Sequence, residues 1–190
     1  MLISHSKKFL FFHLYKAAGS SLVQALSPFC ESRTSNPHFK PSEALGDPGF
    51  SELYKDYFTF SFVRNPWDWQ VSLYEYMRCT PNHPQHQLCM EKSFHDYILW
   101  RVNNERKTQF SFLSDQANDS SPLSLDFIGK VENIQQDFND LRLRFGIDTD
   151  LPHINKSSRK GAYQDYYSPE TADLIREAFK LDIETFNYHF

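Results

Sequence analysis

The chain has 190 residues, of which 40% are hydrophobic and 16% aromatic, so one domain with a substantial core is predicted over residues 1–190. The net charge of −4 argues against nucleic-acid binding, which depends on basic surface. Three cysteines do not suit a disulfide framework and favour a reducing, cytoplasmic location. Because no stretch approaches the ~20 apolar residues of a membrane span, we expect neither a span nor a signal peptide.

The first informative stretch runs from Lys8 to Leu22. Its apolar part, Phe9 to Phe12, has the length and aromatic content of a buried strand, and a helix is predicted over 19–28. The turn that leads into this helix contains the small residues Ala17 and Ala18 and carries Lys16. Such a loop suits phosphate binding, because the N–H groups and the dipole of the helix start attract anions. The alternative for Lys16 is an ordinary solvated surface charge.

This loop differs from the nucleotide-triphosphatase motif, in which the order is Gly-x4-Gly-Lys-Ser/Thr. Here Lys16 precedes Gly19 by three residues. A magnesium-dependent kinase or GTPase is therefore disfavoured, and a small P-loop kinase is kept only as an alternative.

The second informative stretch, residues 58–74, again leads from an apolar strand into a helix. The strand is predicted over 58–63 and the helix over 66–78, with Pro66 at the first helical position. Arg64 lies where the strand ends, and Ser72 lies two helical turns further on. A guanidinium group and a hydroxyl can together bind a phosphate. The alternative for Arg64 is a salt bridge to Asp68.

The rest of the chain continues the alternation of strands and helices. A short helix is expected near 42–45, further helices over 91–101, 131–145 and 169–179, and a strand over 125–129. Residues 79–90 and 103–124 are predicted to be loops. Alternating strands and helices imply a parallel sheet with helices on both faces, and a ligand beyond the carboxyl ends of its strands.

Four possible zinc ligands occur in the first of these loops: Cys79, His83, His86 and Cys89. Their spacing lacks the paired C-x2-C and H-x3-5-H pattern of common zinc sites. We therefore predict no metal, and we expect residues 79–89 to form a loop on the substrate side.

The two informative stretches resemble the two cofactor motifs of the sulfotransferases, in particular the carbohydrate-type branch, sulfotransferase family 2. The first motif has the form Phe-x-His-x-x-Lys-x-Ala-Gly-Thr-Ser, and the second Phe-x-Phe-Val-Arg-Asn-Pro-x-Asp-Arg-x-x-Ser-x-Tyr. The chain departs from them at Ser20, where threonine is usual, and at Trp69, where arginine is usual. We expect the second change to affect only a contact on the helix surface. The matching positions are Phe11, His13, Lys16, Ala18, Gly19, Ser21, Arg64, Asn65, Pro66, Asp68, Ser72 and Tyr74.

The resemblance extends over nearly the whole chain, because residues 126–133, 151–157, 166–170 and 182–188 are similar to later segments of the same family. It implies an α/β, P-loop-like three-layer fold with a central parallel sheet flanked by helices. It also implies 3′-phosphoadenosine 5′-phosphosulfate as the donor and a hydroxyl-bearing acceptor, a glycan in this branch. A non-catalytic nucleotide- or glycan-binding module on the same fold is the alternative.

The resemblance also assigns residues to the donor. Lys16 would neutralise or protonate the leaving phosphate oxygen, and Arg64 and Ser72 would bind the 3′-phosphate. A basic loop further on would close over the nucleotide, with a solvated linker as its alternative; its residues are Lys156, Ser157, Arg159 and Lys160. The 5′-phosphosulfate would be bound by Lys16, Ala17, Ala18, Gly19, Ser20 and Ser21.

An acceptor hydroxyl needs a general base, and histidine is the usual residue for this role. His38 lies between the two motifs, where the family has a histidine followed by a short helix, so we predict His38 as the base and Lys16 as its catalytic partner. His13, Glu43 and Glu132 are alternatives. His153 could instead orient the C-terminal loop.

Overall fold

The computed structural model describes residues 1–115, 123–152 and 161–190. The chain groups into two compact units, each built from two separate stretches. Unit 1 contains Met1–Arg64 and Gln109–Asn155, and unit 2 contains Asn65–Thr108 and Lys156–Phe190. The single domain over residues 1–190 stays a prediction.

Unit 1 contains a five-stranded sheet in the order β3-β1-β2-β4-β5. Its centre is parallel as predicted, since β2 pairs with β4 and β4 with β5, while β1 runs antiparallel to both β2 and β3. The prediction of a fully parallel sheet is therefore wrong at this edge. Only four residues join β1 to β2, which allows a hairpin but no crossover. The strands are β1 Leu2–Ser4, β2 Phe9–Phe12, β3 Ser32–Arg33, β4 Phe58–Val63 and β5 Phe127–Lys130.

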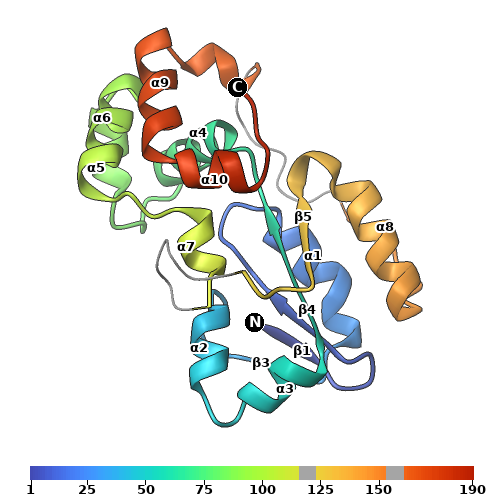
Figure 1. The fold of residues 1–190 in the computed structure, drawn as a ribbon. Helices are drawn as coiled ribbons and strands as arrows, with labels where there is room; N and C mark the ends of the chain where they lie inside the picture. The colour runs from blue at the N-terminus through green and yellow to red at the C-terminus, as the bar shows by residue number, and fades with distance from the viewer. Residues whose placement is uncertain (116–122, 153–160) are drawn as a thin grey trace. The chain divides into compact units, whose positions relative to one another are not determined.

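Helices cover both faces of this sheet, as the sequence predicts (Figure 1). Successive strand side chains point to opposite faces, so Phe9 and Phe11 pack in one core cluster and Leu10 and Phe12 in the other. The first cluster includes residues of α1 (Gly19–Leu26) and α8 (Ile134–Phe145). The second includes residues of α2 (Pro41–Gly46) and α3 (Ser51–Asp56). Because strand side chains alternate between the two faces, helices pack on both faces of the sheet. The loops at the strand ends project from this layered arrangement.

Unit 2 consists of helices. In it, α6 packs against α9, and α4 packs against α5 and the short turn η3. Pro66 at the first position of α4 and the Asn65 side chain, which accepts a hydrogen bond from the Trp67 N–H at 3.1 Å, together define where α4 starts. The helices are α4 Pro66–Arg78, α5 His86–Glu91, α6 Phe94–Asn104, η3 Tyr163–Tyr166, α9 Pro169–Ala178 and α10 Lys180–Thr185.

Trp69 corrects one expectation from the sequence. Its side chain is fully buried and contacts Phe179 edge to face, with ring centroids 6.3 Å apart. The interpretation of position 69 as a helix-surface contact is wrong for this chain, because here the position belongs to the core of unit 2.

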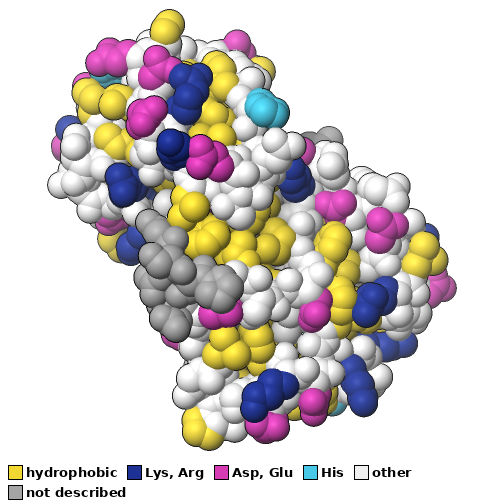
Figure 2. Space-filling view, viewed as in Figure 1, with side chains coloured by type: hydrophobic (Ala, Val, Ile, Leu, Met, Phe, Trp, Pro, Cys, Tyr) yellow, Lys and Arg dark blue, Asp and Glu magenta, His cyan; other side chains and the backbone are white. Residues whose placement is uncertain are grey.

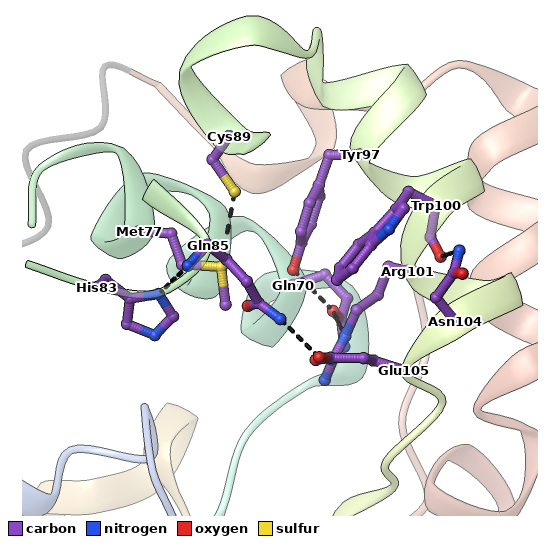
Figure 3. A network of polar contacts seen from close by, with 10 residues as sticks. All are labelled: Gln70, Met77, His83, Gln85, Cys89, Tyr97, Trp100, Arg101, Asn104 and Glu105. Atoms are coloured by element: carbon purple, nitrogen blue, oxygen red, sulfur yellow. Dashed lines mark hydrogen bonds and ion pairs between the residues drawn. The ribbon is translucent and has the colours of Figure 1, made fainter. Parts of the chain in front are cut away.

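A chain of buried polar contacts links α4, α6 and the segment that precedes α5 (Figure 3). Arg101 is 2% exposed; its Nη1 donates to Glu105 Oε2 at 2.9 Å and its Nε to Gln70 Oε1 at 3.3 Å. Gln85 Nε2 donates to the other Glu105 oxygen at 2.7 Å. Because a buried guanidinium needs these partners, the network holds the three segments together.

Two predicted loops contain helices that the sequence did not reveal. Residues 79–90 include most of α5, and residues 103–124 include α7, which spans Gln109–Leu113. Both helices have six residues or fewer, which is too short for a periodic pattern to emerge. The loop interpretation is therefore wrong for these two stretches.

Candidate active site

The loop between β2 and α1 is strained. Lys16 has φ 61° and Ala18 has φ 57°, so two residues other than glycine adopt the left-handed conformation within three positions. The turn is closed by the Ala17 N–H, which donates to Leu14 O at 3.4 Å, and by the Ser21 N–H, which donates to Ala18 O at 3.1 Å. Strain of this kind is common at binding and catalytic sites, where the surrounding structure enforces it.

Gly19 begins α1 because no larger residue fits there. A Cβ atom at this position would lie 1.6 Å from His13 Nε2. The imidazole of His13, which follows the end of β2, therefore lies directly against the start of the helix. This close approach explains why the loop has glycine at the point where an anion would meet the helix N-terminus.

Arg64 follows the last residue of β4 and is fixed by a buried amide. Its backbone N–H donates to Gln109 Oε1 at 2.9 Å, and its carbonyl accepts from Gln109 Nε2 at 2.7 Å. Its Nη1 donates to Lys16 O at 3.3 Å. The side chain of Gln109 is fully buried in α7, so the sequence interpretation of 103–124 as a surface loop missed the residue that orients Arg64.

Two cations thus lie together beyond the carboxyl ends of two neighbouring parallel strands. The pKa of Lys16 falls to about 8, first because burial desolvates its ammonium group and second because Arg64 repels it. Like charges held close in a partly dry site favour an anionic ligand, whose charge would reverse both effects. The structure therefore brings together Lys16 and Arg64, as the two motifs predict.

His38 contacts the same loop. Its Nδ1 lies 2.9 Å from His13 O, and since a carbonyl only accepts hydrogen bonds, Nδ1 carries the proton. In neutral His38 the lone pair is then on Nε2, the tautomer that a general base needs. The two imidazole rings are 4.7 Å apart, and burial followed by the nearby His38 lowers the pKa of His13 to about 4. His13 is therefore neutral near pH 7 and serves to position the loop and His38.

The remaining candidate residues lie elsewhere or outside the described ranges. Glu43 in α2 accepts a hydrogen bond from the Lys40 N–H at 2.7 Å, and Glu132 lies exposed in the short turn η2, Val131–Asn133. Ser72 is a buried residue of α4 in unit 2. Its role, like that of the other donor-binding residues, stays a prediction. The residues outside the described ranges are His153, Lys156, Ser157, Arg159 and Lys160.

Three of the four candidate zinc ligands make contacts with neighbouring groups of the protein. His86 Nδ1 donates to Met77 O at 2.9 Å. Cys89 Sγ lies 3.6 Å from the sulfur of the same methionine (Figure 3). His83 Nδ1 accepts from the Gln85 N–H. Within the described ranges, no three His, Cys, Asp or Glu residues lie close enough to bind a metal ion. In those same ranges, every helix is too short or too polar to cross a bilayer.

The layered α/β unit and its paired cations define a protein that binds an anionic ligand at the carboxyl end of its sheet. A model of the sulfotransferase family matches residues 1–189, nearly the whole chain. The protein therefore belongs to the sulfotransferase family, a membership that points to sulfuryl transfer. Comparisons with curated proteins and with solved structures gave no match.

Proposed function

We propose that this protein transfers a sulfuryl group from 3′-phosphoadenosine 5′-phosphosulfate to a hydroxyl group of a carbohydrate, on a P-loop-like fold. One observation carries the proposal: Lys16 and Arg64 lie together where β2 and β4 end, and the Lys16 ammonium is partly desolvated beside Arg64. Two adjacent cations suit a ligand with more than one phosphate-like group better than a single carboxylate.

The proposed binding mode follows from the order of these residues. The phosphosulfate would contact the start of α1, where Gly19 lets the ligand approach the backbone and the helix dipole favours negative charge. Lys16 would face the phosphate oxygen that leaves. Arg64, together with Ser72, would bind the 3′-phosphate.

In the proposed reaction, the acceptor hydroxyl oxygen attacks sulfur in line with the departing phosphate oxygen. An oxygen–sulfur bond to the acceptor forms and the bond from sulfur to the phosphate oxygen breaks, as in phosphoryl transfer. The hydroxyl proton passes to His38 Nε2, and Lys16 offsets the charge that develops on the phosphate oxygen. The products are a sulfate ester and 3′-phosphoadenosine 5′-phosphate. The bond from His38 Nδ1 to His13 O supports this role, because it stabilises the imidazolium ion that forms.

The direct test of this function is a transfer assay with sulfur-labelled donor and a panel of mono- and oligosaccharides. Label should appear in a sugar sulfate ester, and the reaction should not need a divalent metal. Transfer of phosphate from ATP with magnesium would support the kinase alternative instead. Donor binding without label in any product would leave a non-catalytic module as the better description.

A second test concerns the 3′-phosphate. 3′-phosphoadenosine 5′-phosphate should raise the melting temperature more than adenosine 5′-phosphate or ATP does, because ligands that bind the native state stabilise it by mass action. Equal shifts for the three nucleotides would contradict the assignment of Arg64 and Ser72.

A third test concerns the base. His38→Ala should lower kcat by roughly 10²-fold or more while leaving the affinity for 3′-phosphoadenosine 5′-phosphate unchanged. If His38→Ala keeps full turnover and Glu43→Ala or His13→Ala abolishes it with nucleotide binding intact, the base is one of these alternatives.

A further inference from the structure

The side-chain amide of Gln109 pairs with both polar backbone groups of Arg64. Gln109 Oε1 accepts from the Arg64 N–H at 2.9 Å, and Gln109 Nε2 donates to the Arg64 carbonyl at 2.7 Å. Two residues that face each other in an antiparallel ladder exchange the same two kinds of bond. Gln109 therefore acts toward Arg64 as a residue of a neighbouring strand would.

This pairing begins where the strand ladders of β4 end. The ladder with β2 reaches Ser61 and the ladder with β5 reaches Val63, so Arg64 is the next residue along the chain. A side chain of α7, 45 positions later in the sequence, continues the pairing from there. The backbone that carries the Arg64 guanidinium is therefore held in one place beyond the end of the sheet.

A buried amide at position 109 is favourable only when its hydrogen bonds are made. Gln109 is fully buried in α7, together with the apolar residues Phe110, Phe112 and Leu113. An amide without partners in such surroundings costs free energy, whereas an apolar side chain of the same size does not. Gln109 therefore contributes through its bonds, and the two to Arg64 are both short.

The far end of Arg64 is fixed as well, since its Nη1 donates to Lys16 O at 3.3 Å. This arrangement keeps two like charges close together, and the pKa of Lys16 is lowered first by burial and second by Arg64. Repulsion favours an arrangement in which the Arg64 side chain turns away from Lys16 into water. That turn would have to be reversed before one anionic ligand could contact both cations, and a preorganised pair avoids this step.

We propose that Gln109 is a positioning residue for the donor: it fixes the backbone of Arg64 and so keeps the guanidinium beside Lys16 before any ligand binds. The inference rests on the proposed function, in which Arg64 binds the 3′-phosphate. Gln109 acts through Arg64 and needs no contact of its own with the donor. Its loss should therefore impair recognition of the 3′-phosphate and spare recognition of the rest of the nucleotide.

The first test compares 3′-phosphoadenosine 5′-phosphate with adenosine 5′-phosphate in NMR titrations, because the ratio of their affinities isolates the 3′-phosphate. Gln109→Met keeps the length of the side chain and removes both bonds to Arg64. It should lower the ratio at least fivefold, with the affinity for adenosine 5′-phosphate changed by less than twofold. An unchanged ratio, or an equal loss of affinity for both nucleotides, would overturn the inference.

Leu113→Ala serves as the matched control within α7, because Leu113 is also fully buried. It should lower the melting temperature and leave the affinity ratio unchanged. A fall in the ratio equal to that of Gln109→Met would show that damage to α7, and not loss of the amide, is responsible. Should Gln109→Met fail to fold, Gln109→Asn makes the same comparison, since its shorter amide cannot keep both bonds at their present lengths. An unchanged ratio in Gln109→Asn would count equally against the proposal.

A double-mutant cycle tests whether Gln109 acts through Arg64. Arg64→Ala should lower the affinity ratio by more than Gln109→Met does. Adding Gln109→Met to Arg64→Ala should then change the ratio by less than twofold, because no guanidinium is left to position. Losses that multiply in full would mean that Gln109 affects the nucleotide independently, which contradicts the proposal.

A measurement on the ligand-free protein separates this inference from the proposed function. NMR relaxation of the Arg64 guanidinium should show a less ordered side chain in Gln109→Met than in the wild type. Equal order in the two proteins would overturn the inference whether or not the nucleotides bind. If the wild type shows no preference for the 3′-phosphate, the proposed function fails, and the relaxation data alone decide whether Gln109 holds Arg64 beside Lys16.

Discussion

The two ends of the sheet in unit 1 both carry cations but use them differently. At the carboxyl end, Lys16 and Arg64 lie together and repel each other, and the pKa of Lys16 falls to about 8 because its ammonium is desolvated. At the amino end, a groove of about 490 Å³ is lined by cations and acids together: Lys7, Lys8, Lys55, Arg144, Asp56 and Asp126.

Three of these cations at the amino end have local partners. Lys7 Nζ donates to the carbonyl of Gly146, the C-cap residue of α8, at 3.1 Å, and Lys55 pairs with Glu52 at 2.8 Å. The Arg144 guanidinium lies 4.0 Å from the Phe58 ring centre. Positive groups near helix C-termini are favourable, and Figure 2 shows both signs interspersed over the α3 and α8 side of this unit. The amino end therefore uses charge for stability, whereas the carboxyl end accepts a loss of stability so that an anion can bind.

Replacing one lysine at each end of the sheet by methionine should give the largest difference in turnover and in melting temperature. Lys16→Met should lower kcat by roughly 10²-fold or more, because the leaving oxygen loses its counter-charge, and should raise the melting temperature by removing a desolvated cation. Lys7→Met should leave turnover unchanged and lower the melting temperature slightly. Label transfer and thermal unfolding measure both effects. A lower melting temperature in Lys16→Met would contradict the view that this end is held under electrostatic strain.

Arg64→Ala should weaken binding of 3′-phosphoadenosine 5′-phosphate by about 1.5–3 kcal/mol, as expected for one charge-assisted contact. At saturating donor, kcat should stay close to that of the wild type, because the 3′-phosphate does not change during transfer. Isothermal titration and steady-state kinetics separate the two quantities. A large fall in kcat with intact affinity would mean that Arg64 acts on the transferred group instead.

The titration of Lys16 should make both the stability of the protein and its nucleotide affinity depend on pH, which tests the same comparison. Its pKa is about 8 in the folded protein against 10.5 for a freely solvated lysine, so between these pH values the unfolded state binds more protons. This group should therefore make the ligand-free protein more stable as pH rises from 8 to 10.5, while nucleotide affinity falls as Lys16 loses its charge. Denaturant titrations at several pH values, with Lys16→Met as the reference, isolate the contribution. A stability difference independent of pH over this range would contradict the shift.

The smallest expected effect concerns backbone strain. Ala18→Gly should stabilise the protein by about 0.5–1 kcal/mol, because glycine adopts a positive φ without the steric penalty of a Cβ atom. The neighbouring Ala17 has no positive φ, so Ala17→Gly should destabilise by a similar amount. Chemical denaturation measures both variants. The same sign of change in both would mean that strain at residue 18 does not matter.

The sequence was most informative where local signals and tertiary structure agree. The predicted bounds of β4 and α4 match the structure because an apolar strand ends at Arg64, and Asn65 and Pro66 then start a helix. β1 and β3 were missed, since three- and two-residue strands carry too little pattern. Helix α10 was missed for a similar reason, because the predicted helix ended at residue 179 and α10 adds only six residues.

For the site, motif spacing was enough to bring Lys16, Arg64 and His38 to one region of unit 1. It could not reveal Gln109, because the role of this residue depends on how α7 packs against Arg64, a separation of 45 positions in the sequence. The alternating pattern of Gln109-Phe110-Ser111-Phe112-Leu113 was the available signal, and a stretch of five residues is compatible with several structures.

The order of the strands has a consequence for synthesis on the ribosome. The interior strand β4 pairs with β2 on one side and with β5 on the other, and β5 is made more than sixty residues later. Until residue 130 has emerged from the ribosome, the apolar strand Phe-Thr-Phe-Ser-Phe-Val has one edge without a pairing partner. Unit 2 is also incomplete at that stage, because its second stretch begins at Lys156. Nascent or truncated chains that stop before β5 should therefore aggregate and need chaperones. Any fragment prepared for study should include both stretches of unit 1, Met1–Arg64 and Gln109–Asn155.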